Sequence, residues 1–242
     1  MKITAPHAKD LDDQSQPDTA ANDDSDQPQC NFGNTAGRPR AADKEARLHA
    51  LLHTAAELFL AKGYGKVSLE MIAREAHVAV RTIYVKFGGK AGLLKAVIIH
   101  GRALLFEGMQ NMETDPRPIP EVLHEFSRRF LNLVTIPTFF NMYRMVVAEA
   151  KTTPELAEAF YEAGPKLTRE QLATYFARPD IRAQMRDDLP FDELPVFLLN
   201  CVIGDQLKPL LFALDHRFEE HEIQDRIEIG LQLFLAAVMR RA

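Results

Sequence analysis

Apolar residues recur every three to four positions along most of the chain after residue 42. This period is typical of amphipathic α-helices, and no stretch bounded by turn residues alternates apolar and polar positions as a half-buried strand does. The pattern therefore predicts an all-α fold. The predicted helices cover about 43–62, 69–76, 80–87, 91–112, 121–135, 138–151, 154–163, 166–177, 192–214 and 219–240, with an interruption at Gly164-Pro165.

Residues 67–90 (VSLEMIAREAHVAVRTIYVKFGGK) contain two short amphipathic helices around a tight turn. The first begins near Leu69, where Ser68 is placed to act as the N-cap. The second buries Ile83 and Phe87, which lie one turn apart. Helices this short are unstable alone in water, so they need the preceding long helix as a scaffold. The exposed side of the second helix is polar, basic and aromatic, as in a recognition helix, and it carries Val80, Arg81, Thr82, Tyr84 and Lys86.

The segment from about residue 45 to 105 resembles the helix-turn-helix domain of the tetracycline-repressor (TetR/AcrR) family of bacterial transcription regulators. The resemblance rests on RLHALLHTAAELFLAKGY, then VSLEMIAREA, then the recognition helix VRTIYVKF and a lysine three residues later. It implies an N-terminal three-helix DNA-binding domain over 43–105, with the helix-turn-helix motif at 68–87. It also implies a C-terminal helical domain over 106–242 for effector binding and dimerisation.

The resemblance implies DNA contacts residue by residue. Base edges would face Val80, Arg81 and Tyr84, phosphates would face Thr82, Lys86 and Lys90, and Ser68 and Leu69 would lie at the helix end nearest the DNA backbone. Because a guanidinium binds guanine O6 and N7 in a bidentate fork, Arg81 is the main expected source of sequence preference. The alternatives are that Tyr84 packs on the first helix, Thr82 is only solvated, Lys90 is only a surface charge and Val80 completes the corner between the helices.

The corner departs from the usual family pattern. His77 stands where the turn normally has glycine, and Ala79 stands where a capping hydroxyl is common. Gly88-Gly89 and Ala91 replace a polar, acidic start to the next helix. Histidine tolerates the left-handed backbone region less well than glycine. We therefore expect a slightly strained turn and a weakly capped recognition helix.

Charge is distributed unevenly along the chain, whose total formal charge is −5. Residues 37–90 contain ten Lys or Arg against five acidic residues, whereas residues 1–36 contain two Lys against seven Asp. The remaining part, 91–242, contains seventeen basic against twenty-two acidic residues. A basic segment inside an acidic protein is the electrostatic pattern of a local DNA-binding surface.

The N-terminal residues 1–36 are rich in Asp, Gln, Pro, Asn and Ser and poor in large apolar groups. Such a composition cannot bury enough surface to offset its ordering entropy, so an acidic disordered tail is expected. Residues 37–42 follow as a short basic arm with Arg38 and Arg40. Arms of this kind enter a minor groove in some DNA-binding proteins, and the alternative is a solvated linker.

The last two predicted helices, over 192–214 and 219–240, have more apolar surface than one small domain covers. A homodimer through these helices would bury it. The family resemblance implies a four-helix bundle with the twofold mates, which would place two recognition helices on successive major-groove turns. The DNA partner would then be a double-stranded, imperfectly palindromic operator.

The resemblance also implies a ligand cavity in the second domain. The residues available to line it are large and adaptable, and their abundance favours a small apolar or aromatic effector. Arg144 and Glu149 either orient a polar end of the effector or pair with other side chains. The aromatic and methionine positions equally suit an ordinary core. The candidates are Phe106, Met109, Phe126, Phe130, Phe139, Phe140, Met142, Tyr143, Arg144 and Phe197.

Other classes of protein lack support. Cys30 and Cys201 suggest neither a disulfide framework nor a metal site, no signal peptide or membrane span is apparent, and a reduced, cytoplasmic location is expected. His216 and His221 are five residues apart, which on a helix puts them on different faces and argues against a zinc site. No nucleophile elbow or phosphate-binding loop occurs, so no enzyme, metal or cofactor is expected.

The sequence therefore predicts a DNA-binding transcriptional regulator of the nucleoid. We expect a ligand-responsive repressor that binds a palindromic operator as a homodimer. The alternative is a helical protein-interaction module that does not bind an operator. Binding that falls steeply with salt and selects one short palindrome would distinguish the regulator from the module.

Overall fold

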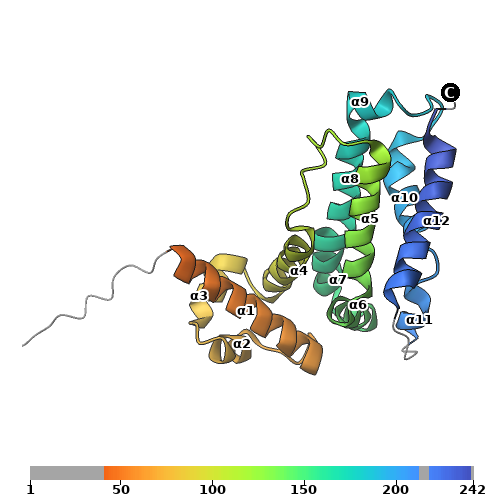
Figure 1. The fold of residues 1–242 in the computed structure, drawn as a ribbon. Helices are drawn as coiled ribbons and strands as arrows, with labels where there is room; N and C mark the ends of the chain where they lie inside the picture. The colour runs from red at the N-terminus through yellow and green to blue at the C-terminus, as the bar shows by residue number, and fades with distance from the viewer. Residues whose placement is uncertain (1–40, 213–217, 241–242) are drawn as a thin grey trace, which may run out of the picture. The chain divides into compact units, whose positions relative to one another are not determined.

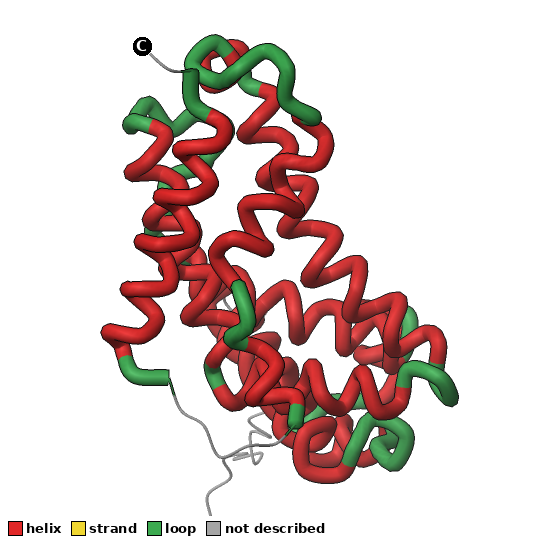
Figure 2. The backbone as a smooth tube through the Cα atoms, turned by 90° about the vertical axis from the view of Figure 1, so that its right-hand side faces the viewer, coloured by secondary structure: helices red, strands yellow, loops and turns green. Residues whose placement is uncertain are grey.

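The computed structural model describes residues 41–212 and 218–240, in which all regular secondary structure is helical (Figures 1 and 2). The predicted all-α fold class is confirmed. The predicted tail and both arginines of the predicted arm, Arg38 and Arg40, lie outside the described residues. The elements are α1 (Ala41–Lys62), α2 (Leu69–Glu75), α3 (Val80–Phe87), α4 (Lys90–Phe106), α5 (Ile119–Thr135), α6 (Pro137–Glu149), α7 (Pro154–Tyr161), the π-helix η1 (Glu162–Lys166), α8 (Leu167–Ala177), α9 (Pro179–Arg182), the 3₁₀-helix η2 (Phe191–Glu193), α10 (Leu194–Ile203), α11 (Leu207–Leu211) and α12 (Glu220–Val238).

Helices α1, α2 and α3 form a head in which one long helix supports two short ones. Phe59 of α1, Ile72 of α2 and Ile83 of α3 are completely buried, together with Leu93 and Leu94 at the start of α4. Helix α1 has 22 residues, whereas α2 has seven and α3 has eight. Helices as short as α2 and α3 depend on tertiary packing, and α1 and α4 supply it.

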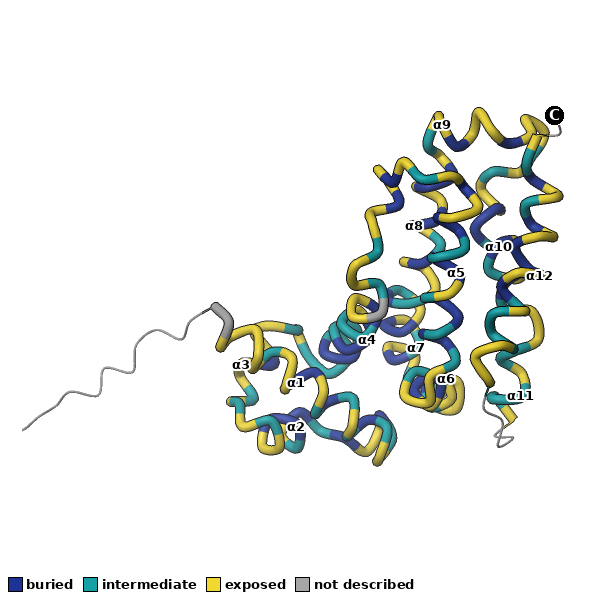
Figure 3. The backbone as a smooth tube through the Cα atoms, in the orientation of Figure 1, coloured by how far each residue is buried: buried dark blue, intermediate teal, exposed yellow. Residues whose placement is uncertain are grey.

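The described residues contain two hydrophobic cores (Figure 3). The first joins the head and α4 to the inner faces of α6 and α7, including Val146 and Phe160. The second lies among α5, α8, α10 and α12, with Phe126 and Phe234 fully buried. Phe139 packs against both cores. The interior of the head therefore continues into α6 and α7.

Helix α4 is shorter than predicted, since it ends at Phe106 rather than near residue 112. The chain leaves the helix at Glu107, whose ψ is 134°, and turns at Gly108, whose φ of 75° lies in the left-handed region that favours glycine. In the following loop, buried Asp115 accepts hydrogen bonds from the backbone N–H and the guanidinium of Arg117, and Arg178 donates to two loop carbonyls. Arg117 holds the pKa of Asp115 below its ordinary value.

The predicted interruption at Gly164-Pro165 is wrong, because helical backbone continues from α7 through η1 into α8. A proline ring in an α-helix clashes with the carbonyl four residues earlier and removes a hydrogen bond. The wider π turn of η1 accommodates Pro165 without breaking the helix. The Thr168 hydroxyl donates a hydrogen bond to the carbonyl oxygen of Gly164, the residue before the proline, at 3.0 Å.

The predicted helix over 192–214 is divided into α10 and α11 by a turn at Gly204. Gly204 has φ 55°, and a helix ends readily at a glycine in this region. Arg226 of α12 donates hydrogen bonds to the carbonyls of Cys201 and Val202, which replace lost helical bonds at the end of α10. The break is therefore fixed by a side chain distant in sequence.

Helices α10 and α12 approach each other closely at Gly230. A Cβ atom at this position would lie 2.4 Å from the Cys201 carbonyl oxygen, which is far below a van der Waals contact. Glycine is needed here because backbone of one helix occupies the place of a side chain on the other. The pair is consequently packed backbone against backbone. Among the described residues, no helix is both long and apolar enough to cross a membrane.

Candidate DNA-binding surface and effector cavity

A local cap fixes the start of α2. Ser68 Oγ accepts a hydrogen bond from the backbone N–H of Met71 at 3.2 Å, which confirms the predicted N-cap. The side chain of Leu69, however, is only 6% exposed and packs in the core of the head. The position of Leu69 at the helix end nearest the DNA backbone stays a prediction, and because its side chain is buried, only its backbone amide is available there.

The turn between α2 and α3 has the strain that the sequence predicts. His77 has φ 53° and is the one non-glycine residue with positive φ in the described part of the chain. A side chain in this region costs free energy that glycine would avoid. Ala79 is the N-cap of α3 and makes no side-chain cap. The recognition helix is thus held mainly by the burial of Ile83, since its own start is uncapped.

The outer side of α3 is accessible to a ligand as large as DNA. Arg81, Thr82 and Lys86 are exposed, and Tyr84 is 53% exposed. Tyr84 is therefore not packed away on α1, which was the alternative. Val80 is half-buried against the core of the head, in agreement with the alternative that it completes the corner.

Sequence reasoning missed Val85, which is 77% exposed. Val85 and Tyr84 are the exposed hydrophobic side chains of α3, whereas Val80, Ile83 and Phe87 are buried or half-buried. The helical period was the available signal, since Val85 lies four residues after Arg81 and so shares its face. Apolar side chains contact thymine methyl groups in major grooves.

Lys90 binds the protein itself. Its ammonium group donates to the carbonyl oxygens of Tyr64 at 2.8 Å and Val67 at 2.9 Å, and it lies 4.2 Å from the centre of the Tyr64 ring. Burial lowers the pKa of Lys90, and the charges of Glu149 and Glu155 partly offset that effect. Lys90 is therefore not a free surface charge, and one of its three N–H groups remains for another partner.

Glu149 ties the end of α6 to the same loop. Its two carboxylate oxygens accept hydrogen bonds from the backbone N–H groups of Tyr64 at 3.0 Å and Gly65 at 2.8 Å. The sequence left open whether Glu149 orients an effector or pairs within the protein, and the structure has it bound to the head. We call Glu149, Lys90 and the loop between α1 and α2 the clasp.

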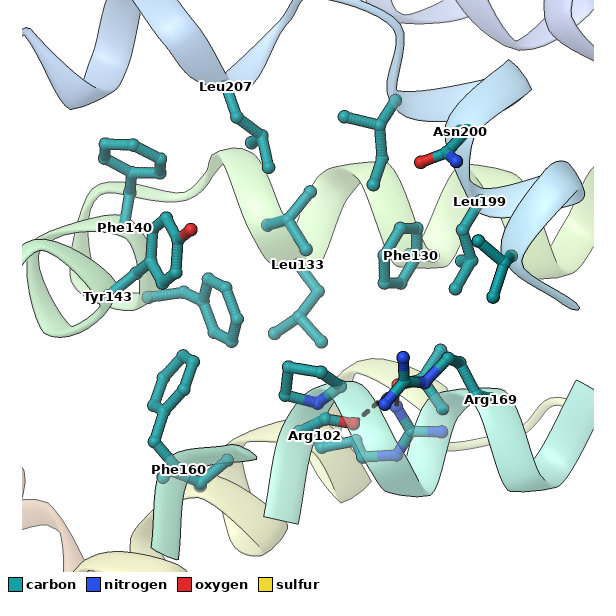
Figure 4. Close-up of a pocket in the computed structure, with 18 residues that line it drawn as sticks. Arg102, Phe130, Leu133, Phe140, Tyr143, Phe160, Arg169, Leu199, Asn200 and Leu207 are labelled. Carbon is teal, nitrogen blue, oxygen red and sulfur yellow. Dashed lines mark hydrogen bonds between the residues drawn. The ribbon is translucent and has the colours of Figure 1, made fainter. Parts of the chain in front are cut away.

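A cavity of about 280 Å³ lies among α4, α5, α6, α7, α8 and α10 (Figure 4). Of the predicted lining residues it contains Phe130, Phe139, Phe140 and Tyr143. Phe160 of α7 completes the aromatic part, with ring centres 6.0 Å from Phe139 and 5.8 Å from Tyr143. The cavity thus has an aromatic wall built from three helices.

The other predicted lining residues lie elsewhere. Phe126 is buried in the second core, and Phe106 and Met109 pack against that core. Phe197 is 50% exposed, and Arg144 is also exposed. Met142 lines a neighbouring cavity of about 230 Å³ between α1, α4, α5 and α6. For the buried residues the reason is that helical spacing identifies a buried face but not whether that face meets a core or a cavity. Phe197 and Arg144 instead lie on exposed sides of their helices.

Sequence reasoning also missed the polar residues of the cavity. Arg102, Thr168, Arg169 and Asn200 all line it. Arg102 is 9% exposed, and its guanidinium donates to the Thr168 hydroxyl and the Gln171 side-chain oxygen. The available signal was a cation inside the apolar run VIIHGRALLF of α4. Burial lowers the pKa of Arg102.

An apolar surface is left open on α10 and α12. Phe197 of α10 is exposed, as are Ile229 and Leu233 of α12, which lie one turn apart on the same side. Ala236 and Ala237 extend the exposed strip toward the end of α12. An apolar area of this kind on a folded protein is typical of an interaction surface.

The fold is similar to those of solved transcription regulators. A tetR-family regulator from Mesorhizobium loti aligns with a TM-score of 0.66 at 20% identity over 84% of this chain and all of that one. The flavonoid-responsive regulator FrrA aligns with a TM-score of 0.63 at 27% identity, covering 82% and 100%. NalD of Pseudomonas aeruginosa, the secondary repressor of the MexAB-OprM efflux pump, gives 0.55 at 23% identity over 83% and 100%.

Family models match both parts of the chain. Residues 51–97 match the model described as bacterial regulatory proteins of the tetR family, and residues 121–191 match the C-terminal domain of AefR-like transcriptional repressors. No curated protein matches the chain. With a helix-turn-helix head, a second helical region and this shared fold, the chain belongs to the tetR family of bacterial regulatory proteins and is a DNA-binding transcriptional regulator.

Proposed function

We propose that this protein is a ligand-responsive repressor that binds a palindromic operator as a homodimer in the bacterial cytoplasm, on the nucleoid. One observation carries the proposal: a single helix, α4, extends from the head to the cavity. Its first residue, Lys90, holds the head loop, and its residues Ile98 and Arg102 line the cavity. A displacement of α4 by a ligand therefore acts on the recognition helix.

The proposed DNA contacts follow from exposure on α3. Arg81 reads guanine, and Val85, in place of half-buried Val80, contacts a thymine methyl. Tyr84 lies beside them, while Thr82 and Lys86 bind phosphates. Lys90 contributes its remaining N–H to a phosphate, with its position already fixed by the clasp. Ser68 and the backbone amide of Leu69 approach the DNA backbone at the start of α2.

We place the dimer interface on α10 and α12, as predicted from their apolar character. The exposed side chains of Phe197, Ile229 and Leu233 support this assignment. Burial of such a strip against its twofold mate would stabilise the dimer through the hydrophobic effect. A light-scattering mass equal to one chain at micromolar concentration would contradict it.

A second link between cavity and head runs along α6. Phe139, Phe140 and Tyr143 of α6 line the cavity, and Glu149 at its end binds the head loop. A ligand that displaces α6 would loosen the clasp, so both α4 and α6 connect ligand binding in the cavity to the head. By linkage, an effector lowers DNA affinity only as far as it binds the DNA-free conformation more tightly.

The effector is proposed to be a small aromatic molecule. The aromatic wall of the cavity supports this class, and so does the likeness to FrrA, a flavonoid-responsive regulator that is 27% identical to this chain. A sugar would instead need several convergent polar groups. Among the cavity-lining residues, the polar side chains are few and lie mainly on α4 and α8.

Selection of bound sequences from random DNA tests the proposal. We expect one imperfect palindrome with half-sites about one helical turn apart, and binding that falls steeply with salt. Arg81→Ala should relax preference at one base pair per half-site, with a loss of about 1–3 kcal/mol. Arg128→Ala, an exposed change on α5 outside the basic segment 37–90, is the matched control. Binding without selectivity or salt dependence would favour a protein-interaction module instead.

A further inference from the structure

Arg102 carries a buried charge with only neutral partners. It donates to Thr168 and Gln171, and its guanidinium carbon lies 4.9 Å from the centre of the Phe106 ring. In the described part of the chain, no ion pair joins Arg102 to a carboxylate. A buried cation is costly unless an anion accompanies it. The site around Arg102 is therefore electrostatically incomplete.

A second cation lies on the same wall. Arg169 follows Thr168 directly on α8 and lines the cavity beside it. Its guanidinium donates to the Tyr161 hydroxyl and stacks on that ring, 5.1 Å from its centre. Figure 4 shows Arg102 and Arg169 on the side of the cavity opposite Asn200. The cavity-lining residues include both arginines and no Asp or Glu, so the formal charge of the lining is positive.

The rest of the cavity is apolar and aromatic. Phe140, Tyr143 and Phe160 gather at one end in Figure 4, away from Asn200. The ring centres of Phe140 and Tyr143 are 5.9 Å apart. The cavity volume of about 280 Å³ suits a molecule with a single aromatic ring or two fused rings. The cavity therefore has an aromatic end that suits a flat apolar ring and a wall with two arginines that suits a negatively charged group.

We propose that the effector is an aromatic carboxylate, with its rings against Phe139, Tyr143 and Phe160 and its carboxylate bound by Arg102 and Arg169. This inference rests on the proposed function, because it assigns the effector to this cavity. Arginine is suited to the task, since its planar fork binds both oxygens of a carboxylate at once. The ligand supplies the counterion that the described protein lacks.

The charge of the ligand then has a mechanical role. Arg102 belongs to α4 but is hydrogen-bonded to Thr168 and Gln171 of α8. A carboxylate competes with these neutral acceptors for the guanidinium, because it carries the opposite charge and its two oxygens can form parallel hydrogen bonds with the planar fork. Binding therefore changes the attachment of α4 to α8. A neutral aromatic ligand fills the same space but leaves that attachment intact.

The test compares two isosteric probes on the full-length protein by isothermal titration calorimetry. The probes are 2-naphthoate and 2-naphthamide at neutral pH, where only the first is charged. We expect the wild-type protein to bind the acid about tenfold more tightly than the amide. In Arg102→Gln and in Arg169→Gln this preference should fall from about tenfold toward none, through weaker acid binding and unchanged amide binding. Arg128→Gln, an exposed change on α5, should behave as wild type.

Several outcomes overturn the inference. They are equal or tighter binding of the amide, binding of neither probe, and a preference that survives in both arginine variants. Melting temperatures of all variants show which are folded, and Arg169→Gln remains informative if Arg102→Gln is not. Operator affinity separates the two proposals. An acid that binds through the arginines without releasing DNA refutes the ligand-responsive function alone, whereas DNA release by the amide alone refutes the aromatic carboxylate alone.

Discussion

The two ends of α4 each hold a partly buried cation, but the two environments differ. Lys90 binds two carbonyl oxygens and has the charges of Glu149 and Glu155 nearby. Arg102 binds only neutral groups, and burial alone determines the direction of its pKa shift. The head end is complete within the protein, while the cavity end has unused binding capacity. A regulator needs this asymmetry, since its DNA-binding part must be formed before a ligand arrives.

The largest expected effect comes from Gly92, where the head end of α4 meets α3. A Cβ atom here would lie 1.8 Å from the Phe87 carbonyl oxygen. Because backbone on both sides must move, Gly92→Ala should destabilise the protein by at least about 3 kcal/mol and abolish operator binding. Urea denaturation measures the stability. Gly101→Ala on the same helix has free space, and should be neutral or stabilise by about 1 kcal/mol. Equal losses in both variants would contradict this expectation.

The next effect compares the two cations directly. Lys90→Met leaves the carbonyls of Tyr64 and Val67 without their donor, at a cost of about 1–3 kcal/mol. Arg102→Met removes a buried charge that has no counterion in the described residues, so the change in stability without ligand should stay within about 1 kcal/mol. Denaturation of both variants side by side checks the difference. A greater loss at Arg102 would mean that its charge is already compensated.

Glu149 tests whether the clasp carries the signal. Glu149→Gln weakens two hydrogen bonds to backbone amides, with an expected loss of about 1–2 kcal/mol. The effector should then release less operator per bound ligand, because one of two links is loosened beforehand. Fluorescence anisotropy with labelled operator measures this response. Glu158→Gln, an exposed change on α7, should leave it unaltered.

The smallest effect is a pH dependence from the middle of α4. The His100 ring centre lies 4.4 Å from that of His49 on α1, and burial, followed by the charge of His49, lowers the pKa of His100. The ordinary pKa of a histidine is 6.5, so as pH falls the unfolded chain takes up this proton at a higher pH than the folded protein does. Stability should therefore fall as pH falls through about 6.5, until His100 is protonated in the folded protein as well. Thermal unfolding should show a shallower fall in His100→Gln, and an identical slope would exclude this pair as the cause.

Structural features that depend on residues close in sequence could be predicted, whereas those that depend on residues distant in sequence could not. The bounds of α3, the Ser68 cap and the strained His77 depend on neighbours within a few residues, and all three were predicted. The break at Gly204 depends on Arg226, and the position of Glu149 depends on a loop more than eighty residues earlier. No periodicity encodes such pairings.

The cavity illustrates the same limit. Its aromatic residues on α5 and α6 were predicted in part, because large side chains on a buried face are visible in a helical pattern. The arginines were missed because a charged residue within an apolar helical run is ordinarily interpreted as a solvent-exposed side chain. Only packing against α8 reveals that Arg102 is enclosed.

The exposure of Val85 has a thermodynamic consequence for the proposed DNA interface. Its side chain is 77% exposed in the free protein, so contact with a thymine methyl would remove apolar surface from water. That burial contributes a negative heat capacity change on binding, and it releases no counterions. Phosphate contacts weaken as salt rises, while this contribution persists. At high ionic strength, discrimination at the thymine would account for a growing fraction of the affinity that remains.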